Sequence, residues 1–223
     1  MCKNNCTTCS LAVKAAKYHI SDSNRKLVPS KDSNFLIWNL PAVITCPFRT
    51  AHCEESCYAR KSERCYPEVL PARMENLKMS KSDSFVKDMT DIILTRAKKM
   101  KKSQLIVRIH ESGDFYNKEY AEKWLQIIRN CQHDKKILFI AYTKSFKYFD
   151  GIELPENFSL RASIWDDTKE SQKKIVKRNN WDIYTAVEKF TDSDDFCQCR
   201  CKDCATCGKC WDNTVKDIRC EIH

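Results

Sequence analysis

Cysteine is the residue type that stands out in this chain, which has 15 cysteines among 223 residues. One short loop carries three of them, at Cys46, Cys53 and Cys57. A tail carries four more, each separated from the next by two residues: Cys201, Cys204, Cys207 and Cys210. Thiolates are the protein ligands of structural zinc and of iron–sulfur clusters. The cysteines therefore predict metal binding.

Residues 46–59, which we call the Cys46 loop, provide three thiols and not four. A structural zinc site normally takes four protein ligands, whereas a reactive centre keeps one coordination position open. The loop therefore favours a centre that leaves one position for a small molecule.

The tail and the amino terminus add further thiols. In the tail, the spacing from Cys201 to Cys210 is similar to the run that ligates clusters in bacterial ferredoxins. It lacks the long gap between two knuckles that is typical of a zinc ribbon. An iron–sulfur cluster is the favoured occupant, with zinc as the alternative. Near the amino terminus, Cys2, Cys6 and Cys9 follow no strand, so they indicate an auxiliary or fortuitous site.

The remaining composition narrows the setting of the protein. The chain opens without an apolar signal segment and has no run of transmembrane length, so we expect a reduced, cytoplasmic protein with no membrane partner. Its formal net charge of +9 leaves nucleic acid open as a partner. The densest basic run, residues 98–102, falls at the end of an expected helix, where cations complement the helix dipole.

Apolar patterning predicts alternating strands and helices. Strands are expected near residues 35–44, 104–110, 137–142, 158–164 and 181–187, and helices near 54–66, 85–97, 120–131 and 168–179. This alternation indicates an α/β fold, either a partial (β/α) barrel or an open parallel sheet of about five to six strands. We expect three regions: an appendage over residues 1–34, a core over 35–190 and a Cys-rich metal-binding tail over 191–223.

Polar residues follow several of the expected strands. In parallel α/β proteins the functional residues collect in the loops at the carboxyl ends of the strands. Arg108 and His110 end one strand and Lys144 ends the next. Strict alternation along the strand places Arg108, His110 and Ser112 on one face. With only three glycines in the chain, a glycine-rich phosphate loop is not expected.

Several short segments, taken in chain order, resemble a known protein family. These segments are Trp38-Asn39-Leu40-Pro41, Thr45-Cys46-Pro47, Cys57-Tyr58-Ala59, Arg108-Ile109-His110, Ser112-Gly113-Asp114-Phe115, Tyr142-Thr143-Lys144 and Cys210-Trp211. In this order the chain resembles the phage gene-product-88-like protein family, and its cysteine loop and strand order resemble a divergent radical S-adenosylmethionine enzyme.

The second resemblance implies specific roles. Cys46, Cys53 and Cys57 would hold a 4Fe–4S cluster with an open iron, and Ser112, Gly113 and Asp114 would contact S-adenosylmethionine. Arg108, His110 and Lys144 would line the substrate face. The tail would hold an auxiliary cluster. The alternatives are a non-catalytic phage-type protein that binds nucleic acid or a host protein, and a nuclease that uses His110, Glu111 and Asp114 with a divalent ion.

Overall fold

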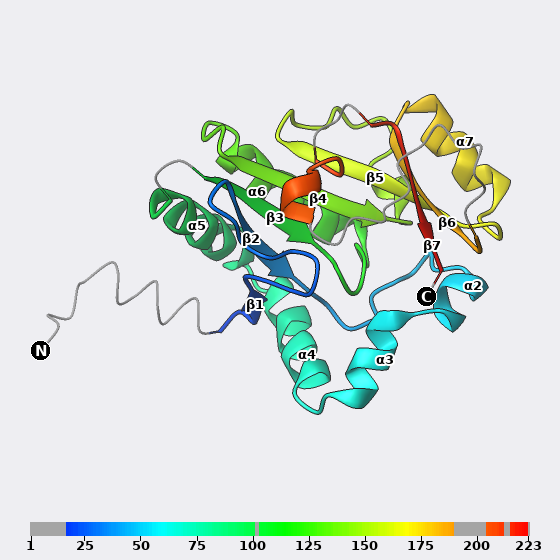
Figure 1. Cartoon of the computed structure of the whole chain (residues 1–223), viewed down its shortest axis with the longest axis horizontal. Helices are drawn as coiled ribbons and strands as arrows, with labels where there is room; N and C mark the ends of the chain where they lie inside the picture. The colour runs from blue at the N-terminus through cyan, green and yellow to red at the C-terminus, as the bar shows by residue number, and fades with distance from the viewer. Residues whose placement is uncertain (1–16, 101–102, 190–203, 212–214, 223) are drawn as a thin grey trace, which may run out of the picture.

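A computed structural model of the chain describes residues 17–100, 103–189, 204–211 and 215–222. It contains one seven-stranded sheet in which the strands follow one another in chain order (Figure 1). The strands are β1 (Ile20–Ser21), β2 (Ser33–Trp38), β3 (Gln104–Ile109), β4 (Ile137–Thr143), β5 (Phe158–Ile164), β6 (Asp182–Val187) and β7 (Asp217–Glu221). Only β1 is antiparallel to its neighbour; β2 to β7 are parallel.

The described helices lie between these strands in the chain. They are α2 (Ala51–Glu55), α3 (Tyr58–Cys65), α4 (Val69–Ser80), α5 (Phe85–Lys98), α6 (Lys118–Cys131), the short 3-10 helix η1 (Phe146–Tyr148), α7 (Glu170–Arg178) and α8 (Cys204–Cys207). None of the helices described is long and apolar enough to span a bilayer.

Because the strand order never reverses, all parallel strand ends meet at one continuous edge, and there is no switch point of the doubly wound kind. The sheet stays open, with β1 and β7 at its two sides. Of the two architectures predicted, the open parallel sheet is therefore the one observed, and the barrel is not confirmed.

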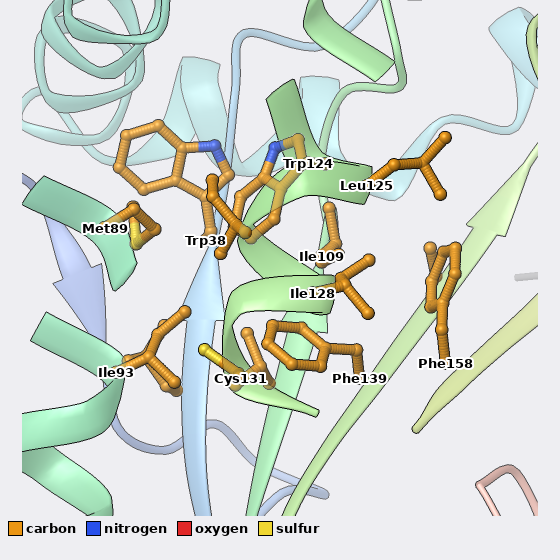
Figure 2. Close-up of a cluster of buried hydrophobic side chains, with 14 of the residues drawn as sticks. Trp38, Met89, Ile93, Ile109, Trp124, Leu125, Ile128, Cys131, Phe139 and Phe158 are labelled. Atoms are coloured by element: carbon orange, nitrogen blue, oxygen red, sulfur yellow. The ribbon is translucent and has the colours of Figure 1, made fainter. Parts of the chain in front are cut away.

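The larger hydrophobic core lies between the sheet and helices α5 and α6. Figure 2 shows residues from both layers packed together: Trp38, Met89, Ile93, Ile109, Trp124, Leu125, Ile128, Cys131, Phe139 and Phe158. Helix α6 presents seven buried residues to this core, and the Asn117 side chain caps it by accepting a hydrogen bond from the backbone N–H of Tyr120 at 2.8 Å. Helix α7 covers the same face over β5 and β6. Its Val176 belongs to one hydrophobic cluster with Ala162 of β5.

The opposite face of the sheet, which we call the tail face, packs against residues of the tail. Phe35, Ile37, Ile106 and Ile140 point to this side and pack against Ala205, Cys210 and Trp211. Figure 1 accordingly shows α8 lying over β3 and β4. The described part of the tail therefore packs on the sheet through α8 and the residues that follow it. Its strand β7 also extends the sheet by pairing with β6.

Three predictions of local structure need correction. The sheet has seven strands, because β1 and β7 come from the segments assigned to the appendage and the tail. The first parallel strand ends at Trp38 and does not continue to residue 44. The helices expected from the sequence omit α4, which contains Pro71 in its first turn, where the missing N–H has no partner to lose.

Candidate functional site

The Cys46 loop begins at the carboxyl end of the first parallel strand. Its entry is a tight turn in which the Thr45 hydroxyl donates to the carbonyl of Pro41 at 2.7 Å and the Cys46 N–H donates to that of Val43 at 3.1 Å. Helix α2 then starts at Thr50, whose side chain accepts from the N–H of Cys53. Cys57 is the N-cap residue of α3. The three thiols are thus placed by a turn, a short helix and a helix start.

Contacts with two other strand ends hold this loop in place. His52 hydrogen bonds through its ring to Asp166 at 2.8 Å, and its backbone N–H donates to Asp167 at 3.0 Å, both in the segment after β5. The Tyr58 hydroxyl donates to the carbonyl of Glu111, after β3. The Cys46 loop therefore lies across the carboxyl edge of the sheet, as the sequence predicts.

The three thiols of the loop are free and half-buried. Burial raises the pKa of Cys46 to about 12, and the nearby charges of Asp114, Cys53 and Cys57 act in the same direction. Such a thiol stays protonated at neutral pH unless a cation favours its thiolate. Across the described part of the chain, however, no three His, Cys, Asp or Glu side chains converge on one point as ligands of a metal ion.

The chain segment after β3 is tied to the segment after β2. Asn39 accepts hydrogen bonds from the N–H groups of Glu111 and Ser112, at 2.8 and 2.9 Å. The Ser112 hydroxyl donates to the carbonyl of Leu40 at 2.9 Å. These bonds fix Ser112 and Gly113 directly beneath the entry to the Cys46 loop.

Asp114 is buried and links β3 to β4. Its carboxylate accepts from the Phe115 N–H at 2.7 Å, from the Thr143 hydroxyl at 2.6 Å and from the Lys144 N–H at 2.9 Å. Burial raises its pKa, and these hydrogen bonds oppose that shift. Both carboxylate oxygens are thus occupied within the chain, so the observed contacts of Asp114 are those of a structural link between strand ends.

Gly113 allows the two segments to approach each other. It has φ +86°, and a Cβ added here would lie 2.6 Å from the Thr45 hydroxyl oxygen and 2.7 Å from the Leu40 Cβ. We expect Gly113→Ala to lower the free energy of unfolding by about 2 kcal/mol, from backbone strain and overlap together. Chemical denaturation measures this.

Gly151→Ala provides the matched control, since Gly151 also has a positive φ, +71°, but has nothing within 4 Å of the added Cβ. Only the backbone cost, about 1 kcal/mol, is expected there. Equal losses for the two variants would contradict the close approach of Gly113 to the Cys46 loop.

His110 does not share a face with Arg108, contrary to the prediction from alternation. It has φ +62°, which turns its side chain away from the tail face into the helix-side core. There its Nε2 atom is hydrogen bonded to the Tyr120 hydroxyl at 2.8 Å, and its ring meets Phe115 edge-on at 4.7 Å. Its Nδ1 atom is buried with no hydrogen-bond partner among the described residues.

This burial makes His110 a source of acid sensitivity. Burial, followed by the charge of Arg108, lowers its pKa from 6.5 to about 3. Below pH 6.5 the unfolded chain therefore binds a proton that the folded chain does not. We expect the free energy of unfolding to fall by about 1.4 kcal/mol per pH unit from this residue as the pH decreases toward the folded pKa.

Denaturation at several pH values, comparing the wild type with His110→Asn, isolates this contribution. Asparagine does not titrate and tolerates a positive φ. The variant should lose part of the acid slope, whereas His133→Asn, at an exposed position, should keep it. Identical slopes for the wild type and His110→Asn would contradict the assignment.

Arg108, on β3, and Lys144, directly after β4, do lie on the tail face. The Arg108 guanidinium stacks 3.8 Å from the ring centroid of Tyr142, and this ring packs against Tyr184 at 4.6 Å. The Lys144 ammonium donates to the Ser163 hydroxyl at 3.0 Å and lies 5.2 Å from the Trp165 ring centroid. The two cations therefore flank a set of aromatic side chains along the carboxyl half of the sheet.

Three of the described tail thiols, Cys204, Cys207 and Cys210, belong to the segment that covers the tail face, and a fourth, Cys220, lies in β7. Burial raises the pKa of both Cys204 and Cys210, while the positive charge of Arg108 lowers it. Gly208, with φ +65°, follows Cys207 in the turn between the last two thiols. Cys201, the amino-terminal Cys2, Cys6 and Cys9, and the tail residues Cys197, Cys199 and His223 lie outside the described residues.

Arg161 anchors this tail, and the sequence predictions omit it. It is fully buried within β5 and donates to the carbonyls of Cys210, Val215 and Lys209 at 2.8, 2.8 and 3.1 Å. A charged residue in the middle of the apolar segment 158–164 is the signal that could have identified it. Its acceptors are backbone groups of a distant segment, which no sequence pattern reveals.

Comparison with known proteins places the chain among phage proteins. A family model described as Gene product 88 matches residues 18–213. The Gene 88 protein of Mycobacterium phage D29 is 29% identical over 109 residues, covering 45% of this chain and 42% of that protein. The Gene 88 protein of Mycobacterium phage L5 is 28% identical over 109 residues, covering 45% and 43%. The match thus spans less than half the length of these relatives. No solved structure matches the chain.

Proposed function

The chain belongs to the Gene product 88 family, and from that premise we propose that it is an iron–sulfur protein whose Cys46 loop ligates a 4Fe–4S cluster. The observation that carries the proposal is the position of the three thiols. They are half-buried in one loop that crosses the carboxyl edge of six parallel strands, where α/β proteins bind their ligands.

The side chains of the loop have the chemistry that such a cluster needs, since three free thiols lie in it, although no three ligand side chains of the described residues converge on one point. Burial, and then the charges of Asp114, Cys53 and Cys57, raise the pKa of Cys46, so a bound cation is needed to favour its thiolate. Iron in a thiolate-ligated cluster supplies that charge.

Three thiols leave one iron of a 4Fe–4S cluster without a cysteine ligand. We propose that this iron takes S-adenosylmethionine, for which a bound cluster would supply one-electron reduction of the sulfonium. The loop would hold the cluster at the edge, and Arg108 and Lys144 would bind and orient the substrate on the tail face. His110, which is buried on the helix side, would support the end of β3 from behind.

The tail thiols Cys204, Cys207 and Cys210, together with Cys201, would hold a second centre on the tail face. An iron–sulfur cluster is proposed there, with zinc as the alternative, because the spacing of two residues suits both. Metal analysis of the purified protein distinguishes the two.

The decisive experiment is metal analysis of anaerobically reconstituted Cys53→Ala. We expect it to lose the iron of the Cys46 loop, about four atoms per chain if a full cluster is held there, with the corresponding loss of visible absorbance. Cys65→Ala is the matched control, because Cys65 is an exposed thiol of the neighbouring helix α3. Full iron content in Cys53→Ala would contradict the proposal.

Two further measurements separate the proposed activity from a non-catalytic role. The electron paramagnetic resonance spectrum of the reduced protein should change when S-adenosylmethionine is added, and 5′-deoxyadenosine should form. A normal iron content without either result would leave an iron–sulfur protein that is not an enzyme of this kind. Salt-sensitive binding of DNA or RNA would then support the alternative role.

A further inference from the structure

Arg108 is a half-buried cation with unused hydrogen-bonding capacity. Its guanidinium stacks on Tyr142, so the N–H donors around its edge point past the ring. Among the described residues, no hydrogen-bond acceptor and no carboxylate partner of this guanidinium is found within the usual distances. An arginine that stacks by its face and leaves its edge available can donate two parallel hydrogen bonds to a carboxylate or a phosphate.

Lys144 is a second cation on the same face, and it is 9% exposed. Its ammonium has one side-chain acceptor, the hydroxyl of Ser163, which is neutral. Asp114 is close enough that the charge of Lys144 opposes the rise of its pKa caused by burial. Its oxygens nevertheless accept from Phe115, Thr143 and the backbone N–H of Lys144, and among the described residues no carboxylate forms an ion pair with the ammonium. An anionic ligand at the ammonium would offset the cost of burying it.

Tyr142 links the positions of the two cations. Arg108 pairs in register with Ile140 on β4, and Tyr142, on which it stacks, is two residues before Lys144, which directly follows that strand. Ser163, which accepts from the Lys144 ammonium, is two residues after Arg161 on β5, so it lies on the tail face. The side chains of Tyr184 and Trp165 lie beside Tyr142 and Lys144, respectively.

We propose that Arg108 and Lys144 form a binding site for an oxyanion group, a carboxylate or a phosphate, of the substrate. The inference rests on the proposed function. It deepens that function by naming the class of substrate that the tail face would bind. The guanidinium edge of Arg108 binds two oxygens of the anion, and the ammonium of Lys144 binds a third or a neighbouring group. The aromatic rings limit access of water to the pair.

Titration of the full-length protein with inorganic phosphate, pyrophosphate and citrate tests this site, by calorimetry and by the fluorescence of Trp165 beside Lys144. We expect saturable binding of at least one of these anions, stronger for pyrophosphate if the ligand group is a phosphate and for citrate if it is a carboxylate. Arg108→Gln and Lys144→Gln should each weaken it about tenfold, as expected for loss of one charge-assisted hydrogen bond.

Two variants serve as controls. Lys173→Gln makes the same charge change on α7, where the lysine pairs with Glu170 on the helix side, and it should leave anion binding unchanged. Arg108→Lys keeps the charge but loses the planar edge, so it should bind more weakly than the wild type. The inference would be overturned if none of the three anions bound saturably. It would also be overturned if Lys173→Gln weakened anion binding as much as Arg108→Gln and Lys144→Gln do.

Failure of this inference can be distinguished from failure of the cluster proposal. Cys53→Ala should retain anion binding, since Cys53 lies in the Cys46 loop and contacts neither cation. Iron binding without anion binding would leave the proposed function standing and remove this inference. Anion binding without iron binding would remove the cluster proposal and leave the anion site.

Discussion

Arg161→Leu is expected to detach the tail from the sheet and to lower the free energy of unfolding by about 3–5 kcal/mol. The arginine is 0% exposed and donates to three backbone carbonyls, those of Lys209, Cys210 and Val215. Its guanidinium also lies 3.8 Å from the Asp182 carboxylate. A leucine leaves the carbonyls of Lys209 and Val215 without this donor, whereas the carbonyl of Cys210 keeps the Ser159 hydroxyl at 3.0 Å. It also leaves Asp182 with Lys216 as its remaining partner.

Hydrogen exchange resolved by segment measures this effect locally. Residues 204–211 should exchange faster in Arg161→Leu, because their position depends on the anchor, while α5 and α6 should keep their protection. Arg161→Lys should fall between the wild type and Arg161→Leu, since an ammonium keeps the charge but cannot reach three carbonyls in a fork.

Arg178→Leu is the control for a lost arginine. Arg178 forms a surface ion pair with Asp150, and its side chain is 59% exposed, so we expect a much smaller loss of stability than for Arg161→Leu. If Arg161→Leu were as mild as this control, or if the tail kept its protection, Arg161 would not be the anchor of the tail.

The sequence predicts the framework of the fold well, because that framework depends on local patterns. The buried faces of α5 and α6 follow from apolar residues at helical spacing, and β3, β4 and β5 follow from apolar runs of strand length. The strands β1 and β7 escape such analysis. They are two and five residues long, and β7 carries Asp217, Arg219 and Glu221, so only pairing with an existing edge makes them strands.

The candidate site is predictable only in part, for a similar reason. Chain order and spacing correctly place the Cys46 loop at the end of the first parallel strand. They do not reveal the turn at His110, because alternation assumes an extended backbone and a single residue with φ +62° reverses it. Nor do they reveal Arg161, whose partners lie about fifty residues away in a segment that packs across the sheet.

Asp114→Ala is expected to destabilise the fold by about 3–5 kcal/mol and to loosen the edge on which the Cys46 loop rests. The carboxylate receives hydrogen bonds from the Phe115 N–H, the Thr143 hydroxyl and the Lys144 N–H. Removing it leaves those donors buried without acceptors. It also removes one of the links between the segments that follow β3 and β4, leaving the bond from the Ser145 hydroxyl to the Phe115 carbonyl.

Asp114→Asn distinguishes the hydrogen bonds from side-chain volume. Both carboxylate oxygens accept from the chain, so an amide must place its NH₂ group against a donor, and we expect a loss of about 2 kcal/mol although the shape is kept. Asp91→Asn, which weakens only the surface pair with Lys87, should cost less than about 0.5 kcal/mol. Urea denaturation measures all three variants. An Asp114→Asn protein as stable as the wild type would mean that Asp114 is not needed as a double acceptor, and the carboxylate would then be available for the role that the family resemblance assigns to it, contact with a bound cofactor.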